Sequence, residues 1–203
     1  MYESRLSKII NNQNLENVWT SIKWQHFPAS AKVDLTQFIA QIKPAIRTKL
    51  LCKAYASELI QLMHSYGWYF AGDGEGYVVI ARDKNLPELI MDVDQSNQPH
   101  ENHLGLLLGY PSCCCRFVSE RGGENNIDEL ASKRKKIEFK GEYTLIDVSH
   151  YLDGISLLSH VPCSYQCFPS LRIAKEMKNF IHQHKECESF SLWSSELARY
   201  YQF

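Results

Sequence analysis

Hydrophobic side chains recur at helical spacing through the first third of this chain of 203 residues. From about Asp34 to Gly67 they return every three or four positions, which predicts helix, and Pro44 is expected to bend or divide the stretch. A weaker pattern of the same period covers the first thirty residues, with Trp19 and Trp24 as candidate packing residues. The amino-terminal third is therefore predicted to be mostly helical.

Aromatic and β-branched runs take over after this region. Trp68–Ala71 and Tyr77–Ala81 flank a glycine-rich segment and predict a β-hairpin. A glycine-rich loop can also bind phosphate, but neither a helix start nor a P-loop lysine follows this one. A second hairpin is predicted over 137–148, turning at Gly141, and a short strand over Ile155–Leu158.

Helical spacing returns between and after these strands. The predicted helices cover Leu86–Val93, Glu101–Leu108, a short segment that starts in the cysteine-rich run, Asn126–Lys135, a long segment from Ser170 onward, and an aromatic segment from Phe190 to Tyr201. The aromatic face of the last helix is expected to be core, or the surface for a homodimer or a protein partner. The elements together predict an α+β fold in which a mostly helical amino-terminal third precedes a small antiparallel sheet with two hairpins, and helices carry a cysteine-rich site.

The length of the chain suits one hydrophobic core. We expect a single domain over 1–203, made of a helical part (1–67), a core with the cysteine site (68–183) and a carboxyl-terminal helix (184–203). The 22 Lys and Arg residues balance 23 Asp and Glu residues, so the charge gives no strong signal for nucleic acid. The basic run Lys133–Lys136 is typical of a solvated helix end.

The first ten residues carry mixed charge and lack the apolar core of a signal peptide. No stretch has the length of apolar sequence that a membrane span needs. We therefore expect a cytoplasmic protein without a membrane partner. In a reducing compartment, clustered cysteines serve as metal ligands or catalytic thiols more often than as disulfides.

Five of the seven cysteines lie in two short segments that each begin with proline. Proline is favoured at the first helical position, so cysteines beside it lie at a helix amino terminus. Backbone N–H groups and the helix dipole stabilise a thiolate there. The five residues are Cys113, Cys114 and Cys115 after Pro111, and Cys163 and Cys167 after Pro162.

Adjacent residues of a helix point about 100° apart, so three consecutive cysteines cannot all face one point. We expect Cys113 and Cys114 to share a site and Cys115 to be a small core residue. Cys163 and Cys167 either occupy the first turn of a helix, with both sulfurs on one face, or lie in a tight turn before a helix that starts near Pro169.

The candidate metal ligands are these four cysteines and His160. A structural zinc site usually takes two CxxC pairs, and that spacing is absent. An iron–sulfur cluster held by cysteines is therefore the leading interpretation. Zinc or mononuclear iron, thiol or persulfide chemistry without a metal, and no shared site at all are the alternatives.

Catalytic candidates lie beside the cysteines. His160 or His103 would donate or accept a proton, and Tyr110 or Ser164 would orient a substrate. Cys187 stands outside both segments and is expected to be an exposed thiol.

The two cysteine segments, His103–Phe117 and His160–Ser170, resemble a family of uncharacterised prokaryotic proteins with LGYPxCC and HxPCSxxCxxS motifs. The resemblance covers about 68–180 and implies no activity. This sequence departs from the pattern with cysteine at 115 and proline at 169. The resemblance selects His103, Gly109, Tyr110, Pro111, Cys113, Cys114, His160, Pro162, Cys163, Ser164, Cys167 and Ser170.

These observations predict a cytoplasmic, metal-dependent enzyme with an iron–sulfur cluster that acts on a small-molecule substrate by sulfur transfer or redox chemistry. One alternative is a non-catalytic protein with a structural zinc site. Another is a cysteine or persulfide enzyme without a metal.

Overall fold

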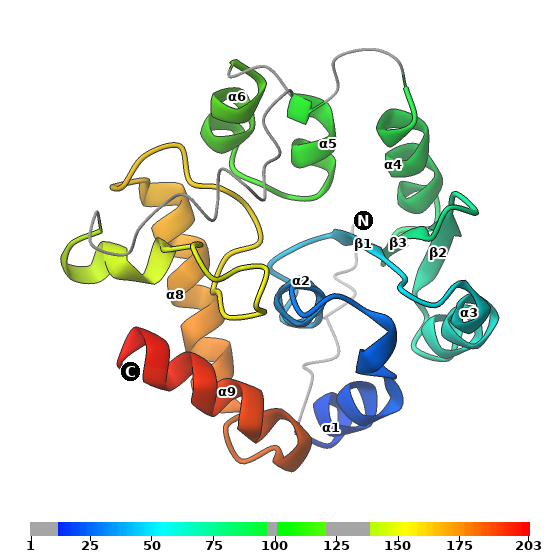
Figure 1. The fold of residues 1–203 in the computed structure, drawn as a ribbon, viewed down its shortest axis with the longest axis horizontal. Coiled ribbons are helices and arrows are strands. Elements are labelled where there is room, and N and C mark those ends of the chain that lie inside the picture. Colours follow the sequence, from blue (N-terminus) through cyan, green and yellow to red (C-terminus); the bar gives the residue numbers. More distant parts are fainter. Residues whose placement is uncertain (1–11, 97–100, 121–138) are drawn as a thin grey trace, which may run out of the picture.

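The computed structural model describes residues 12–96, 101–120 and 139–203. It has the predicted α+β class: helices surround a small antiparallel sheet (Figure 1). In chain order the described elements are α1 (Asn12–Ser21), η1 (Trp24–His26), α2 (Ala31–Ile39), β1 (Ala45–Lys49), η2 (Lys53–Tyr55), α3 (Ala56–Ser65), β2 (Tyr69–Gly72), β3 (Tyr77–Ala81), α4 (Leu86–Asp94), α5 (Glu101–Leu107), α6 (Ser112–Glu120), η4 (Gly141–Ile146), α8 (Phe168–Gln183) and α9 (Glu188–Tyr201).

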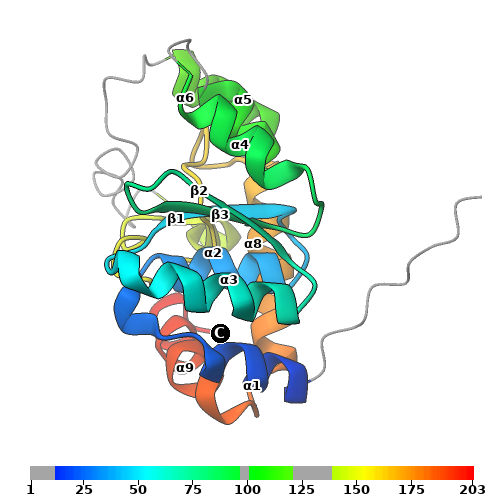
Figure 2. The same ribbon diagram turned by 90° about the vertical axis from the view of Figure 1, so that its right-hand side faces the viewer.

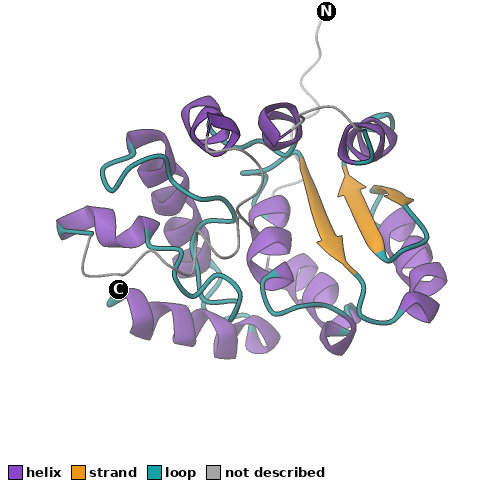
Figure 3. Cartoon of the chain, turned by 45° about the horizontal axis from the view of Figure 1, so that its top comes forward, coloured by secondary structure: helices purple, strands orange, loops and turns teal. Residues whose placement is uncertain are grey.

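The sheet has the strand order β1-β3-β2, and β3 pairs antiparallel with both neighbours (Figure 3). β2 and β3 form the hairpin that the sequence predicts. The carboxylate of Asp73 closes its turn, because Oδ1 accepts hydrogen bonds from the backbone N–H groups of Glu75, Gly76 and Tyr77. Successive residues of a strand point to opposite faces, so β3 contributes to two apolar layers.

Those two layers lie above and below the sheet, with α4 and α5 on one side and α2 and α3 on the other (Figure 2). Val79 and Ala81 of β3 pack with Ile90 of α4 in a small cluster, whereas Val78 and Ile80 belong to the main core. The predicted helices over 86–93 and 101–108 are confirmed as α4 and α5.

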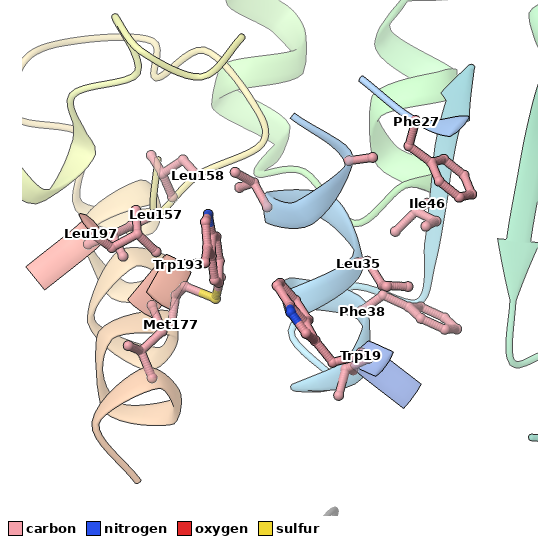
Figure 4. Close-up of a cluster of buried hydrophobic side chains, with 14 of the residues drawn as sticks. Trp19, Phe27, Leu35, Phe38, Ile46, Leu157, Leu158, Met177, Trp193 and Leu197 are labelled. Atoms are coloured by element: carbon pink, nitrogen blue, oxygen red, sulfur yellow. The ribbon is translucent and has the colours of Figure 1, made fainter. Parts of the chain in front are cut away.

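The main core joins both ends of the described chain. Trp19 of α1 packs against Phe190 and Trp193 of α9, with ring centroids 5.0 and 5.3 Å apart. Figure 4 shows further members of this core, including Leu157 and Met177. The aromatic face of the last helix is therefore part of the core.

One helical prediction is wrong. Ala45–Lys49 falls inside the stretch expected to be helical, yet it forms β1 and pairs with β3 along its whole length. Ile46 and Thr48 are β-branched residues that suit a pleated strand, and both are buried. α2 and α3 provide the helix predicted for this stretch, whereas the segments directly before and after β1 are turns.

The second hairpin and the strand over Ile155–Leu158 are also wrong within the described residues. Residues 141–146 form the 3₁₀ helix η4, and 155–158 form a buried loop without strand pairing. Side chains provide hydrogen-bond partners for the backbone of this loop. Gln37 Nε2 donates to the Leu157 carbonyl, while Ser156 Oγ accepts from the N–H of Leu158 and donates to its carbonyl. The helix predicted over 126–135 lies outside the described residues.

The turn between α5 and α6 is held tightly. Gly109 adopts a φ of 83°, and a β-carbon there would lie 2.6 Å from Cδ of Pro44. Only glycine fits that approach without strain. α6 therefore begins at a fixed place beside the loop that leads into β1.

Candidate metal centre

Four cysteine sulfurs lie together at the junction of two segments. The Sγ atoms of Cys113, Cys114, Cys163 and Cys167 are all within 4.8 Å of one another. Cys113 Sγ is 3.9 Å from both Cys114 Sγ and Cys167 Sγ, and the last two are 3.6 Å apart. Such a group of thiols could hold a metal ion.

The first segment is the opening turn of α6. The carbonyl of Pro111 accepts hydrogen bonds from the N–H groups of Cys114 and Cys115, which starts the helix directly after the proline. Cys113 and Cys114 face the cluster. Cys115 points toward α5, with Sγ 3.7 Å from the Tyr110 carbonyl oxygen, and stays outside the group as helix geometry predicts.

The second segment is a tight turn, so the helical alternative for Cys163 and Cys167 is wrong. The N–H of Cys167 donates to the Ser164 carbonyl at 3.3 Å, and Cys167 itself is extended, with a ψ of 104°. α8 starts at Phe168, with Pro169 in its first turn. Cys167 therefore stands at the amino terminus of α8.

The four sulfurs divide into two pairs by exposure. Cys114 and Cys167 are buried, at 2% and 3% exposed, and we call them the inner pair. Cys113 and Cys163 are half-buried, and we call them the outer pair. The site thus has one side in the core and one side toward the surface.

Three of the four thiols have shifted pKa values, and the shifts differ in direction. A hydrogen bond from Cys114, together with bonds from Ser170, lowers the pKa of Cys167 to about 4. The same contact with Cys167 and burial raise the pKa of Cys114, and burial raises that of Cys163 to about 11. Adjacent thiolates repel one another, so ionisation of the whole group requires a cation between them.

Hydrogen-bond donors surround the inner pair. The backbone N–H groups of Cys163 and Ser170 also act on the thiols of Cys114 and Cys167, respectively, and each opposes the rise in pKa that burial causes. Ser170 Oγ lies 3.2 Å from Cys167 Sγ and 3.4 Å from Cys114 Sγ. Donors aimed at sulfur stabilise the thiolate form that metals bind.

The histidines lie outside the close group of sulfurs. His160 is buried, and its Nε2 is 2.9 Å from Ser170 Oγ, one hydrogen bond away from the thiols. Burial, and then the charge of Lys43, lower the pKa of His160 to about 3. His103 is exposed on α5, and Ser164 is exposed in the turn.

Tyr110 connects the centre to a buried polar network that the sequence analysis missed. Its ring lies 5.3 Å from that of His160, and its hydroxyl lies 3.4 Å from Lys43 Nζ. Lys43 forms a buried ion pair of 2.6 Å with Asp34, whose other oxygen accepts the Tyr151 hydroxyl proton at 2.6 Å. No motif links these residues, since the last two are 117 positions apart.

Burial is the largest single effect and lowers the Lys43 pKa, but the charges of Asp34 and Tyr110 and the hydrogen bonds with them together outweigh it and leave the pKa raised. The ammonium group therefore stays charged in the interior, held by its counter-ion.

Cys187 is not the exposed thiol that was predicted. It is buried at the start of α9, and its thiol donates to the Glu16 carboxylate at 2.7 Å. The same carboxylate accepts the N–H of Ser189, so it caps α9.

No family model matches the chain, and no curated protein or solved structure is significantly similar to it. Among the described helices, none combines the length and apolar character needed to cross a membrane. Function must therefore be inferred from the site itself.

Proposed function

We propose that Cys113, Cys114, Cys163 and Cys167 bind one zinc ion, and that the ion joins α6 to the start of α8. The spacing of the sulfurs carries this proposal. A tetrahedral ion with metal–sulfur bonds of about 2.3 Å places its ligands about 3.8 Å apart. The three separations among the sulfurs of Cys113, Cys114 and Cys167, which are 3.6, 3.9 and 3.9 Å, fit that value.

The same spacing supports a single ion over the iron–sulfur cluster that the sequence favours. In a [4Fe–4S] cluster each cysteine binds a different iron atom, and in a [2Fe–2S] cluster two pairs bind different irons. Some ligand sulfurs then stand apart by the width of the cluster. Here every sulfur lies within 4.8 Å of every other.

Four thiolates around one ion complete its coordination. Closed sites of this kind are typical of structural zinc, whereas catalytic zinc keeps a position open for water or substrate. The arrangement therefore supports the non-catalytic zinc protein of the sequence analysis over an enzyme acting on a small molecule. A mononuclear iron would have the same geometry, and metal analysis separates the two.

The ion would act as a cross-link inside the fold. Cys114 packs in the main core while its helix, α6, packs on α5 at the edge of the molecule. Binding of structural zinc contributes about 10–16 kcal/mol in small domains. An ion shared by the two segments would hold α6 against α8 and resist local opening.

Neighbouring cysteines of α6 provide the test. Cys114→Ser should lose the zinc that protein purified anaerobically carries, at one ion per chain, because a hydroxyl is a poor replacement for a thiolate. Cys115→Ser changes an equally buried neighbour outside the group and should keep the ion. A brown protein with iron and acid-labile sulfide, or full zinc content in Cys114→Ser, would contradict the proposal.

A further inference from the structure

Ser170 stands at the junction between the inner sulfurs and the core. It lies in the first turn of α8, three residues after Cys167, and is 0% exposed. Its Oγ has three polar neighbours: Cys167 Sγ at 3.2 Å, Cys114 Sγ at 3.4 Å and His160 Nε2 at 2.9 Å. A fully buried hydroxyl is expected to make hydrogen bonds, and here two of its possible partners are sulfurs of the proposed metal site.

The direction of these hydrogen bonds follows from counting protons. Metal-bound thiolates only accept, so the single hydroxyl proton of Ser170 points to sulfur. Ser170 Oγ is then free to accept from His160. The imidazole is neutral at neutral pH because its pKa is lowered to about 3, and its proton must lie on Nε2 to make this bond.

The imidazole is itself held in place from the other side. Its ring lies against that of Tyr110 at an interplanar angle of 35°. The Tyr110 ring in turn lies 4.7 Å from Lys43 Nζ, which is fixed by its ion pair with Asp34. A continuous set of buried and partly buried contacts therefore runs from the ion pair to the inner sulfurs.

Resting on the zinc site proposed above, we infer that Ser170 and His160 are positioning residues of the metal centre. The hydroxyl of Ser170 donates its one proton to Cys167 Sγ, the nearer of the two inner thiolates, and the Nε2–H of His160 orients that hydroxyl. Four thiolates and one divalent ion carry a net charge of about −2, and each donated hydrogen bond stabilises that charge. The two residues thereby raise the affinity of the site for its ion.

Ser170→Ala removes the hydroxyl and leaves the four ligands unchanged. Ser194→Ala is the matched control, because Ser194 is also a buried helical serine but bonds the Ser191 carbonyl in α9. We expect Ser170→Ala to weaken zinc binding by about 10–100-fold in competition with a chromophoric chelator. Ser194→Ala should bind as the unchanged chain does.

A spectroscopic signature separates this role from general packing. With cobalt in place of zinc, the loss of a hydrogen bond to sulfur raises the energy of its lone pairs. The sulfur-to-cobalt charge-transfer band of Ser170→Ala should therefore move to longer wavelength. His160→Phe retains a ring against Tyr110 and should move the band in the same direction by less.

The outcomes distinguish the two proposals. A wild-type chain that binds neither zinc nor cobalt would overturn the metal site itself. A wild-type chain that binds zinc, with the affinity and cobalt band unchanged in Ser170→Ala, would overturn only the positioning role. Should Ser170→Ala fail to fold by circular dichroism, His160→Phe decides the same question by the same two measurements.

Discussion

Replacing Gly105 with alanine tests whether Cys115 is a packing residue. Gly105 lies in α5 and faces the first turn of α6. A β-carbon at this position would lie 2.7 Å from Cys115 Sγ and 3.3 Å from Cδ2 of Tyr110. The first distance is shorter than two such atoms tolerate, so the sulfur or the helix must move.

Two opposing effects set the size of the change. Alanine in place of glycine stabilises a helix interior by about 1 kcal/mol, while overpacking a tight contact costs about 1–3 kcal/mol. The net result should be a loss of roughly 0–2 kcal/mol. Without the Cys115 sulfur, the closest atom of that residue would be its β-carbon at an ordinary 3.6 Å.

Gly105→Ala should therefore stabilise a chain that already carries Cys115→Ala. The coupling between the two substitutions should be about 1–3 kcal/mol. Urea denaturation of the four chains at one fixed zinc concentration measures it, since a bound zinc ion would also contribute to stability. Additive effects within about 0.5 kcal/mol would refute the contact, and loss of zinc from Cys115→Ala would refute its assignment to packing.

Three further substitutions test the surroundings of the site by their effect on unfolding. Asp34→Asn leaves the Lys43 ammonium buried without its counter-ion and should cost about 3–5 kcal/mol in urea denaturation; a loss below about 1 kcal/mol would contradict the buried ion pair. Glu16→Gln weakens the cap of α9 and should cost about 1 kcal/mol at neutral pH. The Glu16 pKa is lowered from 4.5, chiefly by the hydrogen bond from Cys187. The stability that the Glu16 carboxylate contributes is therefore fully present above pH 4.5 and is lost as the pH falls through the lowered pKa. A difference in stability between Glu16→Gln and the unchanged chain that persists below that pKa would contradict this. Gly154→Ala forces alanine to a φ of 76° with its β-carbon 2.6 Å from a backbone carbonyl oxygen, and thermal unfolding should show a loss of about 2 kcal/mol or more; an unchanged midpoint would contradict the close approach.

Local sequence patterns were sufficient to predict much of the fold. Asn85 and Pro87 mark the start of α4, and the glycine-rich turn marks the β2–β3 hairpin. β1 was missed because the apolar residues around it recur at helical spacing, while its strand character depends on pairing with β3, 28 to 36 positions later. Periodicity over so short a segment cannot separate strand from helix.

The buried loop over 155–158 was missed for a related reason. Its apolar residues suggest a strand, but its backbone partners are side chains such as Gln37, 120 positions away. Contacts over such separations leave no local pattern. The Lys43 and Asp34 pair was missed although the two residues are nine positions apart, because Asp34 lies in α2, Lys43 lies in the turn after it, and no motif marks the pair.

The clustering of the four cysteines was predictable from the sequence, but the metal that they could hold was not. Proline before each segment and the 100° step between helical neighbours indicated Cys113 and Cys114, with Cys115 apart. The number of metal atoms depends on distances between two segments fifty residues apart in sequence, and spacing alone does not give them. His160, a ligand candidate from sequence, lies one hydrogen bond further out, behind Ser170.

X-ray absorption at the zinc edge, on protein purified without added metal, identifies the atoms that surround the proposed ion. We expect a zinc ion surrounded by four sulfur atoms at about 2.3 Å, with no nitrogen or oxygen neighbour. A zinc ion with a nitrogen ligand, or an iron edge with iron–iron scattering in place of zinc, would contradict it.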